Sequence, residues 1–225
     1  MDFKHRFQRW FKFRFAILYP FAIYLIFFAN SDDSSLIRGS CFIAAGLMVR
    51  LWANCYAIKM ERLTTSGPYG HIRHPLYFGT VLIMLGFIVM LKVYWIGALF
   101  LALFLTVYVR TIQKEEAMLV AKFGDAYVNY RKAVPAIFPR LTAYPEGDKW
   151  PFSFERLLKS QEYKLFIWVI ILVIAFHLKD ELIIEREVPD FKIWALVITA
   201  FVLGCSDMIL DMYRKKEHFF RVLNA

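Results

Sequence analysis

The sequence predicts an all-α, polytopic membrane helix bundle, and three observations lead to this fold class. Of the 225 residues, 59% are hydrophobic and 18% are aromatic, whereas soluble domains contain about 45–50% apolar residues. The apolar residues gather into runs that are almost free of charge. Basic and aromatic residues flank these runs, as is typical of helices whose ends lie at a membrane–water interface.

Six apolar runs are the candidate spans, so we expect about six crossings. They cover Phe15–Ala29, Leu36–Ile58, Tyr77–Leu91, Val93–Val109, Leu165–Leu178 and Phe191–Leu210. Several are shorter than the ~20 residues of a full span, and flanking side chains can complete them by snorkelling. A single helix over Tyr77–Val109 would be roughly 50 Å long, which is too long for one crossing. We therefore expect a bend near Lys92–Trp95.

Charge asymmetry predicts the orientation of the spans. Five basic residues and one acid precede the first run, and residues 110–164 include ten bases and seven acids. Residues 179–190 instead contain five acids and two bases. Because basic segments stay on the cytoplasmic side, we expect both termini and residues 58–76 and 110–164 in the cytoplasm. We interpret the first run as a retained span rather than a signal peptide, because no small-residue cleavage site follows it.

The composition also argues against several classes of function. The net charge of +9 does not indicate nucleic-acid binding, because the basic residues flank apolar runs and base-reading motifs are absent. The three cysteines form no CxxC or Cys/His cluster, so neither a disulfide framework nor a metal site is expected. The oligomeric state stays open.

The first segment with chemical character is Glu61–Gly79, which reads ERLTTSGPYGHIRHPLYFG. Ser66, Gly67 and Pro68 are strong turn formers, and Pro75 favours an extended conformation for His74. Irregular backbone next to a membrane needs protein or water around it, so such a loop usually lines a cavity.

The second segment is Arg110–Pro139, which reads RTIQKEEAMLVAKFGDAYVNYRKAVPAIFP. We expect the fourth span to continue beyond the membrane as an amphipathic helix that stops at Gly124. Asp125 is then predicted to cap a second short helix. An aromatic set at helical spacing, which we interpret as packing, consists of Phe123, Tyr127 and Tyr130.

Together these two segments resemble the isoprenylcysteine carboxyl methyltransferase family, which belongs with the phospholipid methyltransferases. The likeness covers roughly residues 36–140 and depends on RHPxY, the double Glu and FGxxYxxYxxxVP in this order. We accordingly divide the chain into a first span (1–35), a methyltransferase core (36–140), and a linker with two further spans (141–225).

The resemblance implies a cytoplasmic pocket for S-adenosylmethionine and a lipid or prenylated acceptor. By motif position, the implied cofactor contacts are Glu61, Arg62, Leu63, Thr64, Tyr69, His74, Pro75, Leu76, Tyr77 and Glu115, with Asn54 as a further candidate. The family has an arginine four residues before the cofactor-binding glutamate, where this chain has Thr111. We expect the adjacent Arg110 to handle the substrate instead.

The residue types suit this chemistry. A carboxylate can bind the amine or ribose diol of S-adenosylmethionine, and His or Tyr can bind its carboxylate. Methyl transfer requires alignment of donor and acceptor without a metal. For an amine acceptor, Glu116 or His74 would accept a proton. Arg50 lies within a span, where it either pairs as a packing device or lines a polar cavity near the active site.

The acceptor stays open between the carboxylate of a C-terminal isoprenylcysteine and the amine of a phosphatidylethanolamine-type phospholipid. Two other classes also stay open. One is an NADPH-dependent reductase, because sterol-reductase-like proteins have a similar C-terminal arrangement. The other is a non-catalytic membrane scaffold or transporter.

Overall fold

A computed structural model describes residues 24–25, 28–57, 62–147, 150–160, 162–184 and 188–223. Within these residues the regular structure is entirely helical, which confirms the predicted all-α class. The chain forms two compact units, Met1–Leu157 and Leu158–Ala225. The predicted first span, Phe15–Ala29, lies mostly outside the described residues.

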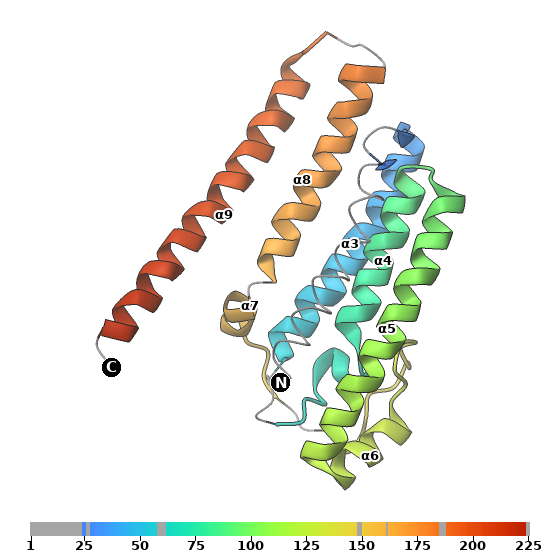
Figure 1. Cartoon of the computed structure of the whole chain (residues 1–225), viewed down its shortest axis with the longest axis vertical. Helices are drawn as coiled ribbons and strands as arrows, with labels where there is room; N and C mark the ends of the chain where they lie inside the picture. Colours follow the sequence, from blue (N-terminus) through green and yellow to red (C-terminus); the bar gives the residue numbers. More distant parts are fainter. Residues whose placement is uncertain are drawn as a thin grey trace, which may run out of the picture. The chain divides into compact units, whose positions relative to one another are not determined.

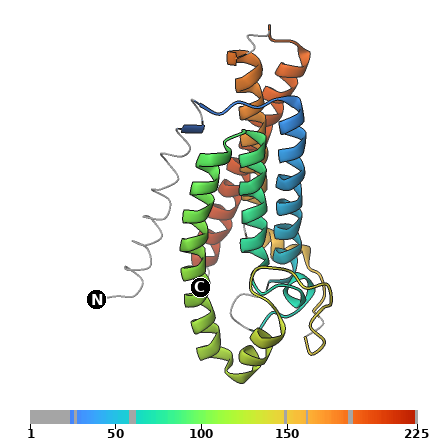
Figure 2. The ribbon, with the colours of Figure 1, turned by 90° about the vertical axis from the view of Figure 1, so that its right-hand side faces the viewer.

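Three long helices form the first unit. They are α3 (Asp33–Tyr56), α4 (Pro75–Met90) and α5 (Tyr94–Phe123), and they lie side by side with alternating directions (Figures 1 and 2). Between α4 and α5 the chain turns at Lys92, whose φ of 53° is unusual for a residue with a side chain. The predicted bend near Lys92–Trp95 is therefore present, and α5 continues past the predicted span, as expected.

Glycines let the backbones of α3 and α4 come into contact. A Cβ added at Gly46 would lie 2.5 Å from the carbonyl oxygen of Gly79, and one at Gly86 would lie 2.7 Å from that of Gly39. In each helix the two glycines are two turns apart and so share one face. Small residues are common where membrane helices approach closely. This glycine seam positions the start of α4, where the functional loop ends.

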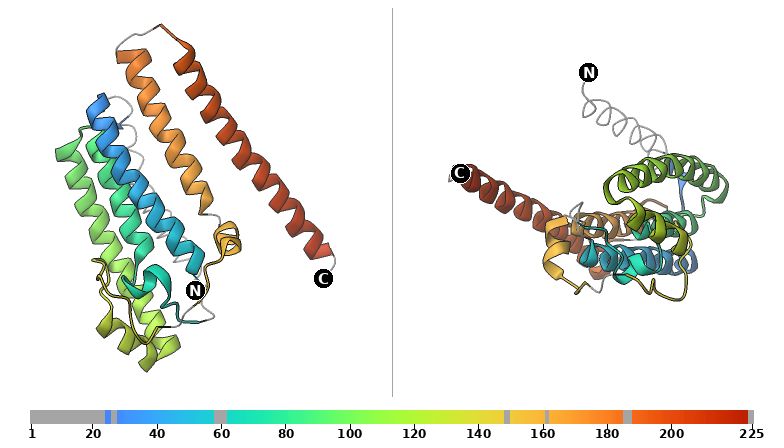
Figure 3. Two further views of the ribbon diagram at one scale, coloured as in Figure 1. Left: turned by 180° about the vertical axis from the view of Figure 1, so that it is seen from behind. Right: turned by 90° about the horizontal axis from the view of Figure 1, so that it is seen from below.

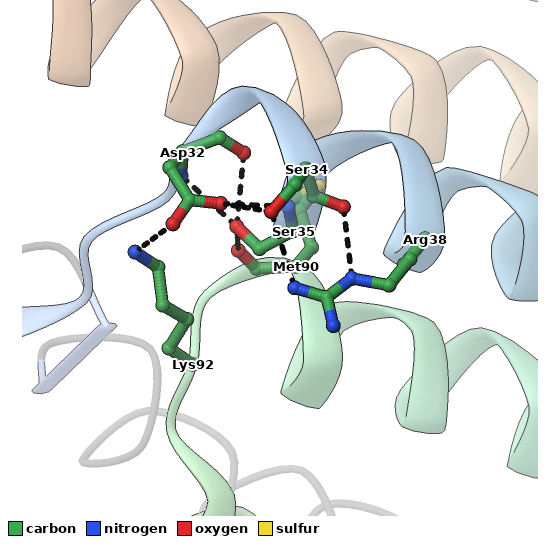
Figure 4. Close-up of polar contacts among 6 residues, drawn as sticks. All are labelled: Asp32, Ser34, Ser35, Arg38, Met90 and Lys92. Carbon is green, nitrogen blue, oxygen red and sulfur yellow. Dashed lines mark hydrogen bonds and ion pairs between the residues drawn. The ribbon is translucent and has the colours of Figure 1, made fainter.

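At the far end of this helix pair, polar contacts hold the start of α3 against the end of α4 (Figure 4). Asp32 and Ser35 form a capping box, in which the Asp32 carboxylate accepts a hydrogen bond from the Ser35 N–H at 2.7 Å. The Ser35 hydroxyl also donates to the carbonyl oxygen of Met90 at 2.9 Å. Lys92 pairs with the Asp32 carboxylate. These contacts fix the register of α3 against the α4–α5 turn.

Short elements gather at the opposite end of the three helices (Figures 2 and 3). They include a 3₁₀ turn, η1 (Gly67–Gly70), and the helix α6 (Asp125–Ala133). Gly124 separates α5 from α6 with a φ of 54°, which glycine adopts without strain. The predicted stop at Gly124 is confirmed. The predicted cap is wrong, because Gly124 is itself the N-cap of α6 and Asp125 is the first helical residue.

The second unit is a helical hairpin that follows the short helix α7 (Phe154–Ser160). It contains α8 (Tyr163–Lys179), a π-helical turn (Asp180–Ile184) and α9 (Phe191–Leu223). Asp207 of α9 accepts a hydrogen bond from the Trp168 indole N–H of α8 at 3.3 Å, and Lys192 of α9 pairs with Glu181 at 2.6 Å. Polar contacts thus join α9 to the first half of α8 and to the π-helical turn.

The number of spans needs correction. In the described part of the chain, three helices are long and apolar enough to cross a membrane: Asp33–Tyr56, Tyr94–Phe123 and Phe191–Leu210. The predicted spans Tyr77–Leu91 and Leu165–Leu178 are helices, but they have only 16 and 17 residues. At 1.5 Å per residue such helices fall short of the roughly 30 Å hydrocarbon layer. Six full-length spans are therefore not present in the described residues.

Candidate active site

The loop before α4 places His74 at the helix start. Pro75 is the first residue of α4, and His74 is its N-cap with a φ of −122°. A return segment, residues 134–147, runs back along this loop and pairs with its backbone. The N–H of Arg73 donates to the carbonyl oxygen of Pro135 at 2.9 Å, and the N–H of His74 donates to that of Ala136 at 3.2 Å. The backbone around His74 is thus held from outside the loop.

The extension of α5 brings two glutamates to this loop. The His74 Nδ1 lies 3.8 Å from the Glu115 Oε2, and its Nε2 lies 3.2 Å from the Glu116 Oε1. The Tyr77 hydroxyl, one turn into α4, donates to the Glu115 Oε2 at 3.0 Å. The RHPLY loop and the paired glutamates, more than thirty residues apart in sequence, therefore meet in one cluster.

Two arginines compensate the charge of the buried glutamate. The Arg73 Nη2 lies 2.8 Å from the Glu116 Oε1, and the Arg131 Nε of α6 lies 3.4 Å from the Glu116 Oε2. Burial is the largest influence on the pKa of His74 and lowers it, although both glutamates act to raise it. Burial prevails over these opposing charges, which favours a neutral imidazole at neutral pH.

The aromatic residues of α6 belong to a small hydrophobic core. Tyr127, Tyr130 and Val134 are buried and pack with neighbours that include Leu63 and Phe123, so the predicted packing role of this aromatic set is confirmed. The Tyr130 hydroxyl donates to the carbonyl oxygen of Tyr69 at 2.6 Å. The Tyr127 hydroxyl is buried without a hydrogen-bond partner among the described residues.

A column of aromatic rings leads from the cluster along α4 and α5. The ring of His74 stacks on Tyr77 with centroids 5.6 Å apart. Tyr77 meets Tyr108 edge to face at 4.6 Å, and Tyr108 contacts Phe104 at 3.9 Å. Phe104 and Tyr108 belong to the apolar part of α5. The polar cluster thus continues into an aromatic surface on the membrane-spanning side.

The structure brings together four of the sequence-predicted site residues, and others have different contacts. His74, Tyr77, Glu115 and Glu116 are in mutual contact. Arg50 instead binds the first turn of α4, where its Nη1 donates to the carbonyl oxygen of Leu76 at 2.9 Å and to the Thr80 hydroxyl at 2.6 Å.

The remaining predicted residues have varied surroundings. Asn54 is buried, and its amide donates to the carbonyl oxygen of Arg50 at 2.8 Å. Arg62 is exposed and lies over the ring of Trp150. Arg110 is exposed and makes no hydrogen bond or ion pair with any described residue. Thr64 and Tyr69 are half-buried in the loop, whereas Glu61 lies outside the described residues.

Sequence reasoning missed two residues of the cluster, Arg73 and Arg131. Arg73 belongs to the RHPLY motif itself, and its place next to His74 was a usable signal. Arg131 is on α6, where sequence reasoning considered only the aromatic residues. No local pattern reveals that Arg131 reaches a glutamate on α5, because this contact depends on the tight turn at Gly124.

No metal site is evident in the part of the chain that the structure describes. No group of three or more His, Cys, Asp and Glu side chains there is arranged to hold an ion. The cluster instead presents one half-exposed carboxylate, one buried imidazole and tyrosine hydroxyls, a set suited to an organic ligand with hydrogen-bond donors.

Comparison with known proteins identifies relatives of the central region. Residues 34–126 match the phospholipid methyltransferase family. The protein-S-isoprenylcysteine O-methyltransferase of Schizosaccharomyces pombe is 34% identical over 106 residues, which are 46% of this chain and 44% of that protein. These matches confirm the resemblance that the motifs indicate.

Other relatives carry different names. The cobalt-zinc-cadmium resistance protein CzcN of Cupriavidus metallidurans is 30% identical over 141 residues, 60% of this chain and 65% of that protein. A methanethiol S-methyltransferase of Crocosphaera subtropica is 37% identical over 79 residues, 35% of this chain and 29% of that protein. The chain thus spans less than two thirds of the length of these relatives. No solved structure matches it.

Proposed function

From the match of residues 34–126 to the phospholipid methyltransferase family, we propose that this chain is an integral membrane methyltransferase that uses S-adenosylmethionine and acts on a lipophilic acceptor. The observation that carries the proposal is the convergence of His74, Tyr77 and Glu115, which come from a loop, the start of α4 and the polar part of α5. A scaffold or transporter has no evident need for this convergence.

The donors and acceptors of the cluster fit S-adenosylmethionine. The side chain of Glu115 is 43% exposed, and its carboxylate can accept hydrogen bonds from an ammonium group or a ribose diol. The rings of Tyr77 and His74 offer flat surfaces next to that carboxylate. The cation of a sulfonium is also attracted to aromatic faces, of which Tyr77 and Tyr108 supply two.

When bound, S-adenosylmethionine supplies an electrophilic methyl group on a sulfonium. The chain's own residues would orient the reactants and exclude water. Such a reaction gains most of its rate from these two effects. Glu115 and Tyr77 would hold the cofactor, and the column of Tyr108 and Phe104 would face the acceptor's apolar part. Glu116 faces two guanidinium groups and an imidazole, which makes it a poor proton acceptor. An amine acceptor would then reach the site already deprotonated, with its proton released to water.

The charges near Glu115 favour an amine acceptor. A carboxylate acceptor would lie near the Glu115 carboxylate and would need a cation beside it. Arg73 and Arg131 already face Glu116, Arg50 binds the start of α4, and Arg110 is exposed without an ion pair to the described residues of the cluster. A lipid headgroup amine, as in phosphatidylethanolamine, needs no such partner.

A second candidate acceptor is an isoprenylcysteine carboxylate. The specific observation in its favour is the similarity to the isoprenylcysteine O-methyltransferase of Schizosaccharomyces pombe. The names of the relatives include O- and S-methyl transfer, so similarity alone does not select the acceptor atom.

The test is methyl transfer by the full chain in liposomes. Protein reconstituted with phosphatidylethanolamine or a farnesylcysteine derivative is incubated with methyl-labelled S-adenosylmethionine, and the lipid extract is treated with base. We expect base-stable label in the amine lipid. Base-labile label in the prenyl compound would select the second acceptor. Label in neither, together with protection of the protein against heat by NADPH but not by S-adenosylmethionine, would contradict the proposal and favour the reductase class.

A further inference from the structure

The adjacent glutamates of α5 have different surroundings. The Glu115 side chain is 43% exposed, whereas that of Glu116 is 9% exposed. Consecutive helical residues project about 100° apart, so the first faces outward and the second points between the loop and α6. Both Glu116 oxygens are already paired with cationic or imidazole groups of the chain, which makes a direct role on a ligand unfavourable.

The contacts of Glu116 determine which ring nitrogen of His74 carries the hydrogen. Each Glu116 oxygen is within 3.4 Å of a guanidinium nitrogen, from Arg73 or Arg131. An ionised carboxylate can only accept hydrogen bonds. The His74 Nε2, at 3.2 Å from the Glu116 Oε1, must then carry the hydrogen. A neutral imidazole has one donor and one acceptor nitrogen.

We infer that Glu116 is a positioning residue that holds His74 in the tautomer protonated on Nε2, with the lone pair of Nδ1 turned toward Glu115. Other contacts fix the residue as well. The backbone N–H of His74 donates to the carbonyl oxygen of Ala136 in the return segment, and the ring stacks on Tyr77 at an interplanar angle of 24°. The imidazole can therefore neither rotate nor exchange its nitrogens without losing contacts.

As a result, two hydrogen-bond acceptors, the His74 Nδ1 and the Glu115 carboxylate, lie next to each other. The His74 Nδ1 makes no hydrogen bond to any described residue and lies 3.8 Å from the Glu115 Oε2, beyond hydrogen-bond distance. Two adjacent acceptors suit a group with two or more donor hydrogens, such as an ammonium. The identification of that group with part of S-adenosylmethionine rests on the proposed function, but the tautomer does not.

The tautomer is measurable without any ligand. The full chain, labelled with ¹⁵N-histidine, is reconstituted in liposomes at neutral pH and studied by solid-state NMR. The His74→Asn variant identifies the resonances of His74. We expect a protonated Nε2 and an unprotonated Nδ1 in the wild type. A proton on Nδ1, alone or together with one on Nε2, would overturn the inference.

Variants at the two glutamates separate positioning from ligand binding. Glu116→Ala should move the proton to Nδ1, because Glu115 is then the remaining carboxylate beside the ring. It should also lower the affinity for S-adenosylmethionine by on the order of 10-fold, as when orienting partners of histidine ligands are removed. Glu116→Gln keeps an acceptor oxygen and should retain the wild-type tautomer and most of the affinity.

Glu115→Ala is the matched control, since it removes the outer carboxylate. This variant should keep the proton on the His74 Nε2 but lose affinity for S-adenosylmethionine. An unchanged tautomer in a folded Glu116→Ala protein would overturn the inference. If that variant does not fold, the tautomers of the wild type and of Glu115→Ala still decide it. Failure of the proposed function would be visible separately, as an intact tautomer in a protein that does not bind S-adenosylmethionine.

Discussion

At the scale of single residues, burial of His74 has a consequence for acid stability. Its pKa is lowered by burial, so the folded protein binds this proton less readily than the unfolded chain, whose histidine has a pKa near 6.5. Well above that pH the residue has no effect. As the pH falls from about 6.5 through the lowered pKa, the unfolded state gains the proton first and folding loses free energy.

We therefore expect the melting temperature of the wild type to fall on acidification below about pH 6.5. The fall should be smaller in His74→Asn, which lacks the titrating group. The measurement is thermal unfolding in lipid nanodiscs over a pH series. Parallel curves for the two proteins would mean that other groups cause the whole dependence.

Two tyrosines of α6 allow a matched comparison. The Tyr127 hydroxyl is buried without a partner among the described residues, whereas the Tyr130 hydroxyl donates to the carbonyl oxygen of Tyr69. Removal of a buried unsatisfied group removes a desolvation cost, and loss of a satisfied bond costs about 1 kcal/mol. Tyr127→Phe should thus unfold at the same or a higher temperature, and Tyr130→Phe at a lower one.

The same pair tests whether Tyr127 contacts a ligand. If its hydroxyl only packs, Tyr127→Phe binds S-adenosylmethionine as the wild type does in calorimetry. A loss of affinity in this variant, with stability unchanged, would place the hydroxyl in the binding site.

At the scale of elements, the glycine seam between α3 and α4 is the most demanding packing feature. An added Cβ at Gly46 would lie 2.5 Å from a backbone oxygen, so the helices must separate to accept it. Such overpacking costs about 1–3 kcal/mol. Gly46→Ala should lower the melting temperature and also weaken ligand binding, because the seam positions the start of α4.

Gly204 in α9 provides the control. An added Cβ there meets nothing within 4 Å, and alanine favours a helix over glycine by up to about 1 kcal/mol. Gly204→Ala should be neutral or stabilising. Equal effects of the two substitutions on melting temperature would argue against close contact between α3 and α4.

The sequence was sufficient to predict the helices that contain apolar runs and the positions of the turns between them. The turn near Lys92 follows from the length limit of one crossing, whereas the stop at Gly124 and the packing of Tyr127 and Tyr130 follow from local sequence. The span count was less predictable, because an apolar run specifies a helix more firmly than it specifies a full crossing.

Contacts between distant segments were beyond the sequence. Arg131 reaches Glu116 only because α6 folds back at Gly124, and the return segment pairs with the His74 loop through backbone groups that any residue carries. Likewise, the motif order predicted that His74 and Glu115 would meet, but not that the neighbouring Glu116 would be buried between two arginines. The different roles proposed for these glutamates therefore come from tertiary structure.

At the scale of the whole molecule, three helices among the described residues are suited to a membrane, and one of them, α5, extends beyond its apolar part to carry the glutamates. The first unit contains every described residue of the cluster. An apolar span that continues into a polar helix end places charged groups next to the bilayer surface. A lipophilic acceptor and a water-soluble methyl donor could meet at such a boundary.

The proposed function requires binding of S-adenosylmethionine at Glu115. Calorimetric titration of the purified full chain should give saturable binding. Glu115→Gln should weaken it by about 10- to 100-fold, the loss expected for a hydrogen bond to a charged group. Asp125→Asn makes the same change of charge at an exposed position of α6 and should bind like the wild type. Equal affinity of a folded Glu115→Gln protein and the wild type would exclude Glu115 as the binding group and overturn the proposed function.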